Sequence, residues 1–166
     1  MAKQSTLIII KPDAIRRGLV GAAISKLEPL GLEILGAKAV RVSRELAEAH
    51  YQHIRAKPFF QETVDHLQGL LNDTHYVVVF VLWGENAVAR VRDVTGATNP
   101  EQADPMSIRG SLGRNLATGL MENVLHASSD PAEAKREIRL WFKPDELLPP
   151  PSAAVEAAVS KLGKRA

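Results

Sequence analysis

His126 lies in a segment whose residue types could support nucleophilic chemistry. A short apolar step through Val124 and Leu125 leads to it, and the small residues Ala127 and Ser128 follow. A neutral imidazole is a good nucleophile near pH 7, because its ordinary pKa is about 6.5. A histidine held by a strand and flanked by small side chains would be open to a ligand. From these residues alone, a packed or surface histidine is the commoner interpretation.

Three cationic residues could supply the second half of such a site. Lys11 follows an apolar run at a predicted strand end, where ligands often bind, while Arg92 and Arg109 lie further along the chain. Together they could clamp a polyphosphate by charge and by bidentate hydrogen bonds, although each one singly is more often a solvated surface charge. The sequence has no glycine-rich phosphate loop of the Walker or Rossmann kind, so a nucleotide would bind by another scheme.

Metal and thiol chemistry find little support in the sequence. His50 and His53 are three residues apart on a predicted helix, but no third ligand stands near them. We therefore interpret both as helix-surface residues. The chain has no cysteine, which excludes disulfides, thiolate metal sites and cysteine nucleophiles.

Hydrophobic periodicity predicts the elements that must position these residues. Residues 6–10 are apolar and β-branched and stop before Pro12, as in a buried strand. Residues 20–30 predict a helix that ends at Gly31. We further expect strands at 32–42 and 76–83, helices at 44–54, 60–71 and 87–94, a loop at 95–113 and a short strand at 123–126.

The last helix has the clearest start signal in the chain. Asp130 is a good N-cap, Pro131 suits the first helical position, and Glu133 completes the first turn. Its buried stripe would consist of Ala134, Ile138, Trp141 and Phe142. Strands separated by helices indicate an α/β domain in the form of a two-layer α+β sandwich.

Composition limits the other classes of function. The 166 residues suit one compact domain, which we place at 1–148, followed by a tail at 149–166 that begins with three prolines. The net charge of +2, with no cationic block, argues against a specific nucleic-acid partner. No stretch approaches the ~20 apolar residues of a membrane span, and the N-terminal apolar run is too short for a signal peptide. We expect a cytoplasmic protein.

Eight segments, in order, resemble the signature of the nucleoside diphosphate kinase family. They are Lys11-Pro12-Asp13, Arg17-Gly18-Leu19-Val20-Gly21, His50-Tyr51, Lys57-Pro58-Phe59-Phe60, Gly96-Ala97-Thr98-Asn99-Pro100, Ile108-Arg109-Gly110, Asn123-Val124-Leu125-His126-Ala127-Ser128 and Leu140-Trp141-Phe142-Lys143-Pro144. The resemblance covers residues 6–148. It implies a ferredoxin-like βαββαβ fold, in which helices cover a four-stranded antiparallel sheet. It also implies a homo-oligomer, with a hexamer favoured over a tetramer.

The same resemblance implies a ping-pong reaction. A nucleoside triphosphate such as ATP or GTP would give its γ-phosphoryl group to His126, and a nucleoside diphosphate would then accept it. Mg²⁺ would be the cofactor, carried by the nucleotide phosphates without a metal site on the protein, since Mg²⁺ keeps most of its waters. The alternative is a catalytically weak, regulatory nucleotide-binding protein on the same fold.

The resemblance also assigns individual roles. Glu137 would hold the second ring nitrogen of His126, with Ser128 bonded to that glutamate and Tyr51 beside the ring. The nucleotide-binding residues would be Lys11, Phe59, Arg92, Thr98, Arg109 and Asn123, with Phe59 stacking on the base. Without the resemblance, we would interpret Glu137 as a surface residue, Phe59 as core and Tyr51 as packing. The loop around Pro100 would contact another subunit.

The sequence departs from the family pattern in four respects. Ser129 stands where relatives usually have aspartate, and Glu122 stands where they often have arginine. The segment 111–122 is a few residues longer than usual, and the segment between Phe60 and Arg92 is slightly long. We expect the longer segments to alter subunit packing or the rim of the nucleotide site.

Overall fold

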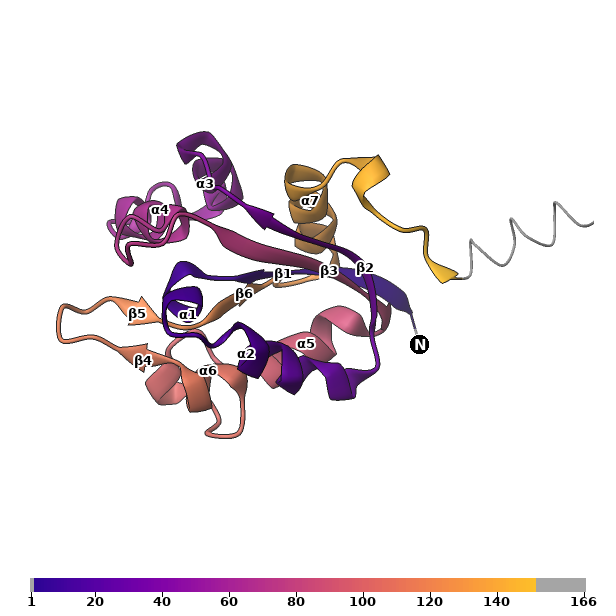
Figure 1. Cartoon of the computed structure of the whole chain (residues 1–166), viewed down its shortest axis with the longest axis horizontal. Coiled ribbons are helices and arrows are strands. Elements are labelled where there is room, and N and C mark those ends of the chain that lie inside the picture. Colours follow the sequence, from indigo (N-terminus) through magenta and orange to yellow (C-terminus); the bar gives the residue numbers. More distant parts are fainter. Residues whose placement is uncertain (1, 152–166) are drawn as a thin grey trace, which may run out of the picture.

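A four-stranded antiparallel sheet forms the centre of the molecule (Figure 1). The computed structural model describes residues 2–151. The strands are β1 (Lys3–Ile10), β2 (Glu33–Val40), β3 (Val77–Glu85) and β6 (Leu125–Ala127), and they lie in the order β2-β3-β1-β6. All neighbouring strands pair antiparallel. This order confirms the predicted ferredoxin-like βαββαβ fold.

Helices cover both faces of the sheet. On one face lie α2 (Val20–Leu27), α5 (Ala87–Thr95) and the short α6 (Ile108–Leu112), and on the other lie α3 (Arg44–His50), α4 (Phe60–Gln68) and α7 (Pro131–Trp141) (Figure 1). Side chains of β1 alternate between the two cores, with Leu7 and Ile9 in one and Ile8 and Ile10 in the other. A strand buried on both faces is apolar throughout. The sandwich predicted from the sequence thus has an additional helix layer on its second face.

Helix ends follow the capping residues closely. The chain leaves α2 through a 3-10 turn (Glu28–Leu30), and Gly31 stops it with a φ of 60°. The Ser43 hydroxyl accepts a hydrogen bond from the Leu46 amide, which caps α3. The Asp130 carboxylate accepts two bonds, from the Ala132 and Glu133 amides, at the start of α7. These three predicted boundaries are confirmed because each rests on a local bond or dihedral angle.

Three of the predicted segments are wrong in extent or type. The helix expected at 44–54 ends at His50, and a separate 3-10 turn follows at Gln52–Ile54. The stripe expected at 60–71 ends earlier, because α4 stops at Gln68 and Gly69 reverses the chain with a φ of 83°, which leaves Leu71 exposed. The expected loop at 95–113 contains α6 and a 3-10 turn (Pro100–Gln102). A helix of five residues is too short to show a hydrophobic period. Its N-cap residue, Ser107, was the available sequence signal for the start of the helix.

The longer segments form structure that the sequence did not predict. Residues 114–122 contain a small hairpin of β4 (Arg114–Asn115) and β5 (Met121–Glu122), which projects beyond the sheet (Figure 1). The other elements are α1 (Pro12–Arg16) and 3-10 turns at Gln52–Ile54 and Pro144–Glu146. Among residues 2–151, no helix has the length and apolar character needed to cross a membrane.

Candidate active site

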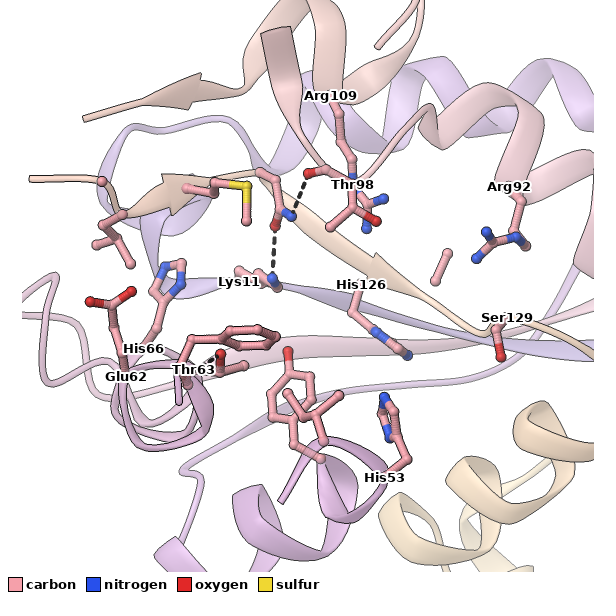
Figure 2. Close-up of a pocket in the computed structure, with 18 residues that line it drawn as sticks. Lys11, His53, Glu62, Thr63, His66, Arg92, Thr98, Arg109, His126 and Ser129 are labelled. Atoms are coloured by element: carbon pink, nitrogen blue, oxygen red, sulfur yellow. Dashed lines mark hydrogen bonds between the residues drawn. The ribbon is translucent and has the colours of Figure 1, made fainter. Parts of the chain in front are cut away.

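A cavity of about 590 Å³ opens at the end of the sheet between α4, the β4-β5 hairpin and β6 (Figure 2). Eight of the predicted site residues line it: Lys11, Tyr51, Phe59, Arg92, Thr98, Arg109, Asn123 and His126. The other two, Ser128 and Glu137, are buried and lie behind the histidine. The fold therefore brings together residues that are far apart in the sequence.

His126 is held by a buried carboxylate. Its Nε2 atom lies 3.0 Å from both oxygens of Glu137, a residue of α7 that is only 2% exposed. The Ser128 hydroxyl donates to the same carboxylate at 2.6 Å. A carboxylate accepts hydrogen bonds, so Nε2 carries the ring proton and the lone pair of the neutral ring is on Nδ1. The interpretation of Glu137 as a surface residue is wrong.

The surroundings of His126 favour its neutral form. Burial lowers the pKa of His126 well below 6.5, and the nearby charges of Lys11 and Arg109 lower it further. A neutral ring has a free lone pair, whereas a protonated ring has none. The site thus keeps His126 nucleophilic across the neutral pH range.

Lys11 belongs to a chain of hydrogen bonds at the floor of the cavity. Its ammonium donates to Asn123 Oδ1 at 2.7 Å, and the Asn123 amide donates to the Thr98 carbonyl at 2.9 Å (Figure 2). Burial lowers the pKa of Lys11 to about 8, partly offset by Asp13. Loops from three parts of the chain are fixed around one cation by these bonds.

The two arginines complete the positive end of the cavity. Arg109 is 8% exposed and donates to the carbonyls of Gly96 and Leu125. Burial and the charge of Arg92 lower the pKa of Arg109 to about 10, so its guanidinium remains charged at pH 7. Arg92 is exposed and also lines the cavity (Figure 2). Three cations that face one space, two of them buried, are suited to a polyphosphate.

The aromatic residues separate into two environments. Phe59 is half exposed at the cavity wall, whereas its neighbour Phe60 packs against the core. Tyr51 is 7% exposed, and burial raises the pKa of its hydroxyl. An exposed ring at a cavity wall is available for stacking, so the interpretation of Phe59 as a core residue is wrong.

His50 lies in the core and not on the surface of its helix. It is fully buried, its Nδ1 accepts a bond from the Trp141 indole at 3.2 Å, and its ring centre lies 4.4 Å from that of His126. Its surface interpretation is therefore wrong. The indole donor leaves the proton of neutral His50 on Nε2, which is unfavourable for a metal bound there with His126 and Glu137. The signal for burial was Ala47, three residues earlier on the same side of α3.

Asp13 supports the turn that leads into His126. Its carboxylate accepts from the Val124 amide at 3.0 Å, and it also lies 3.1 Å from His66 Nε2. Val124 has a φ of 73°, which is unusual for a β-branched residue and is held by this bond. The Lys11-Pro12-Asp13 motif by itself indicates no role for this carboxylate.

The lining residues also bear on the expected cofactor. Mg²⁺ prefers oxygen ligands and retains several of its waters. Within the part of the chain that the structure describes, Glu62 is the single acidic residue that lines the cavity. The residues present thus suit a Mg²⁺ ion that is held mainly by phosphate oxygens and water.

The fold, and a cavity that combines a histidine with three cations, fit the class of phosphotransferases. The family model described as nucleoside diphosphate kinase matches residues 4–147. The chain belongs to the nucleoside diphosphate kinase family, and its activity is that of a nucleoside diphosphate kinase. The alternative of a catalytically weak regulatory protein is not favoured by this family membership.

Known relatives resemble the chain over nearly their whole length. It is 47% identical to the nucleoside diphosphate kinase of Pyrococcus horikoshii over 151 residues, which cover 91% of this chain and 92% of the relative. A Borrelia burgdorferi nucleoside diphosphate kinase structure, a transition state mimic with vanadate and ADP, aligns with a TM-score of 0.80 and 34% identity over 89% of this chain and 92% of that one. The Halobacterium salinarum enzyme in complex with CDP aligns with a TM-score of 0.79 and 34% identity, over 92% and 97%.

Proposed function

We propose that the chain transfers the γ-phosphoryl group of a nucleoside triphosphate to a nucleoside diphosphate through a phosphohistidine at His126. The observation that carries this proposal is the contact of Nε2 with both oxygens of the buried Glu137. That contact leaves Nδ1 as the nucleophile. It also places a carboxylate where the imidazole ring gains positive charge during the reaction.

The transfer takes place in two balanced steps. The Nδ1 lone pair forms a bond to the γ-phosphorus, the bond to the β–γ bridging oxygen breaks, and the diphosphate leaves with that electron pair. A β-phosphate oxygen of a second diphosphate then attacks the same phosphorus, and the nitrogen–phosphorus bond returns its electrons to Nδ1. Because the ring nucleophile is neutral in the resting enzyme, no general base is needed.

The cations contribute charge and alignment. Phosphoryl transfer depends more on positioning and on neutralising oxygen charge than on acid–base chemistry. Lys11, Arg92 and Arg109 would bind the phosphates, and Mg²⁺ on those phosphates would neutralise further charge. Burial of Lys11 and Arg109 strengthens their attraction for anions, because the surroundings are less polar than water.

The remaining side chains would place the nucleoside. Asn123, already bonded to Lys11, is positioned for the ribose, and Thr98 for the phosphates. Phe59 would stack on the base, which requires no particular base because every base has a π-face. Tyr51 would pack beside His126. The Borrelia structure is named with ADP and the Halobacterium structure with CDP, which supports a nucleotide as the ligand.

We propose a homo-oligomer, with a hexamer favoured over a tetramer, and a cytoplasmic location. The loop around Pro100 would make subunit contacts. The assignment of residues 1–148 to the catalytic domain is supported by the family match at 4–147. The tail at 149–166 is proposed as a separate segment, and from residue 152 it lies outside the described residues.

The test is a labelling experiment with γ-labelled ATP and Mg²⁺. We expect an acid-labile, base-stable label on the wild type that GDP releases as labelled GTP, and no label on His126→Ala. His53→Ala is the matched control, because His53 also lines the cavity and should leave labelling intact. A folded His126→Ala variant that still takes the label, or an unlabelled wild type that binds nucleotide, would contradict the proposal.

A further inference from the structure

The charges around the cavity are divided between its ends. Lys11, Arg92 and Arg109 surround the space beside His126, and the one acidic lining residue of the described chain is Glu62. Figure 2 places Glu62 at the far end of the cavity from Arg92, close to Thr63 and His66. A ligand that spans the cavity would thus meet cations at one end and a carboxylate at the other.

Glu62 is available to a ligand. It lies in the first turn of α4, three residues after Phe59, so both side chains project from the same side of that helix. The two neighbouring side chains are engaged in hydrogen bonds to other residues, since Gln61 donates to Asp65 and Thr63 donates to the Phe59 carbonyl. The Glu62 carboxylate is exposed and makes no hydrogen bond or ion pair with any described residue. Its acceptor oxygens are therefore free.

We propose that Glu62 reads the edge of the base and gives the enzyme a preference for guanine nucleotides. The inference rests on the proposed function, which puts the phosphates at His126 and the base on Phe59. A base stacked on Phe59 has its hydrogen-bonding edge directed away from the ribose, toward the end of the cavity where Glu62 lies (Figure 2). Glu62 then distinguishes bases that the stacking residue accepts equally.

The bases differ in how well their hydrogen-bond donors and acceptors match a carboxylate. Guanine presents two adjacent donors, N1–H and the 2-amino group, which match the two oxygens of a carboxylate. Hypoxanthine keeps N1–H but lacks the amino group. Adenine and cytosine offer one amino group beside an acceptor nitrogen. Uracil has its single N3–H between two carbonyl oxygens, which repel a carboxylate, so uracil should be the least favoured base.

The effect will be moderate because Glu62 is exposed to solvent. Water competes for both partners and screens the charge, so we expect a preference of about threefold to tenfold for GDP over IDP. Phe59 and the phosphate ligands still supply binding to every nucleotide. Broad tolerance of bases and a graded preference can therefore exist in the same site.

The experiment compares GDP, IDP and UDP as acceptors from the phosphorylated enzyme in single-turnover assays. We expect kcat/KM to fall in that order for the wild type. Glu62→Gln keeps one acceptor oxygen but loses the second one and the charge, so the ratio of GDP to IDP should fall toward one. The matched control is Glu45→Gln, which neutralises another exposed glutamate in the first turn of a helix, away from the cavity, and should keep the wild-type ratio.

The outcomes separate the inference from the proposed function. An unchanged GDP-to-IDP ratio in Glu62→Gln would overturn the role of Glu62. An equal rise in kcat/KM for all three acceptors would also overturn it, because such a rise indicates only that repulsion between Glu62 and the phosphates is relieved. Both results presuppose that the enzyme forms phosphohistidine. Absence of that intermediate in the wild type would instead overturn the proposed function.

Discussion

At the scale of single residues, His126 and the carboxylate of Glu137 depend on one another. A carboxylate that is 2% exposed is costly to bury unless its oxygens are hydrogen-bonded. Ser128 and His126 provide those bonds to Glu137, and the Ser128 hydroxyl also accepts from the Leu7 amide of β1. The sheet therefore fixes the serine, the serine fixes the glutamate, and the glutamate fixes the ring.

The pKa values of His126 and Lys11 predict the pH dependence of phosphorylation. The pKa of His126 is lowered, so the ring is neutral and reactive at all pH values above that depressed pKa. Lys11 has a pKa of about 8, so its positive charge is lost as the pH rises through 8. We expect kcat/KM for ATP, which reports the free enzyme, to be flat from about pH 6.5 to 7.5 and to fall above pH 8.

Lys11→Arg supplies the control for this profile. Arginine stays charged to a much higher pH, so the alkaline decline should move upward in that variant even if the maximum rate is lower. The measurement is single-turnover phosphorylation between about pH 5.5 and 9.5, the range in which histidine and a depressed lysine titrate. A rate that rises with an apparent pKa near 6.5 would contradict the lowered pKa of His126. An alkaline decline that is unchanged in Lys11→Arg would contradict its assignment to Lys11.

Single residues also mark how far the sequence alone could lead. His126, Lys11 and Arg109 could be selected from their types and context, but their convergence could not, since it depends on how the strands pair. His50 was misplaced because one small apolar residue, Ala47, is a weak sign that this side of the helix faces the core. Its burial depends on Trp141, 91 positions away, which supplies its hydrogen bond.

At the scale of elements, the two longer segments of the chain are joined by a buried acid. Glu122, at the end of β5, is 4% exposed and lies 2.6 Å from Arg114 across the hairpin. It also accepts from the Asn72 amide at 3.1 Å, in the turn between α4 and β3. The residue after it is Asn123, so this connection anchors the strand end that reaches the cavity.

Removing Glu122 should therefore loosen the hairpin. Glu122→Ala leaves the buried Asn72 amide without its acceptor, and we expect the free energy of unfolding to fall by about 1–3 kcal/mol. Urea denaturation measures the change. Glu33→Ala is the control, because Glu33 is exposed at the start of β2 and surface substitutions usually change stability by no more than about 0.5 kcal/mol. Equal losses in both variants would show that Glu122 does not anchor the segments.

The elements that were predicted correctly share a local cause. The helix starts at Ser43 and Asp130 and the stop at Gly31 rest on bonds or angles within a few residues, so the sequence contains them. The β4-β5 hairpin has two-residue strands and is held by a distant asparagine as well as by its own pairing. Such elements depend on tertiary contacts, and the hydrophobic periodicity of a sequence contains no information about these contacts.

At the scale of the whole molecule, the open side of β2 is only partly protected. A register shift interrupts β2 between Ile34 and Gly36, and the Leu148 amide donates to the Leu35 carbonyl, so the C-terminal segment covers part of this edge. Ile34 remains 52% exposed on the same strand. Bulges and covering segments limit edge-to-edge pairing of strands. An exposed apolar residue on the uncovered part of the β2 edge is a natural contact for another subunit.

If subunits associate through this edge, a charge at Ile34 should weaken the assembly. We expect the wild type to have about six times the 18.1 kDa mass of one chain in light scattering coupled to size exclusion, and Ile34→Lys to form smaller species. Leu70→Lys is the control, since Leu70 is 60% exposed beyond the end of α4, away from the sheet edge. Burying a lysine in an apolar contact is unfavourable unless it finds a partner, whereas a lysine that stays in water costs little. A full-sized Ile34→Lys assembly would place the interface elsewhere, and the loop around Pro100 would then be the next surface to alter.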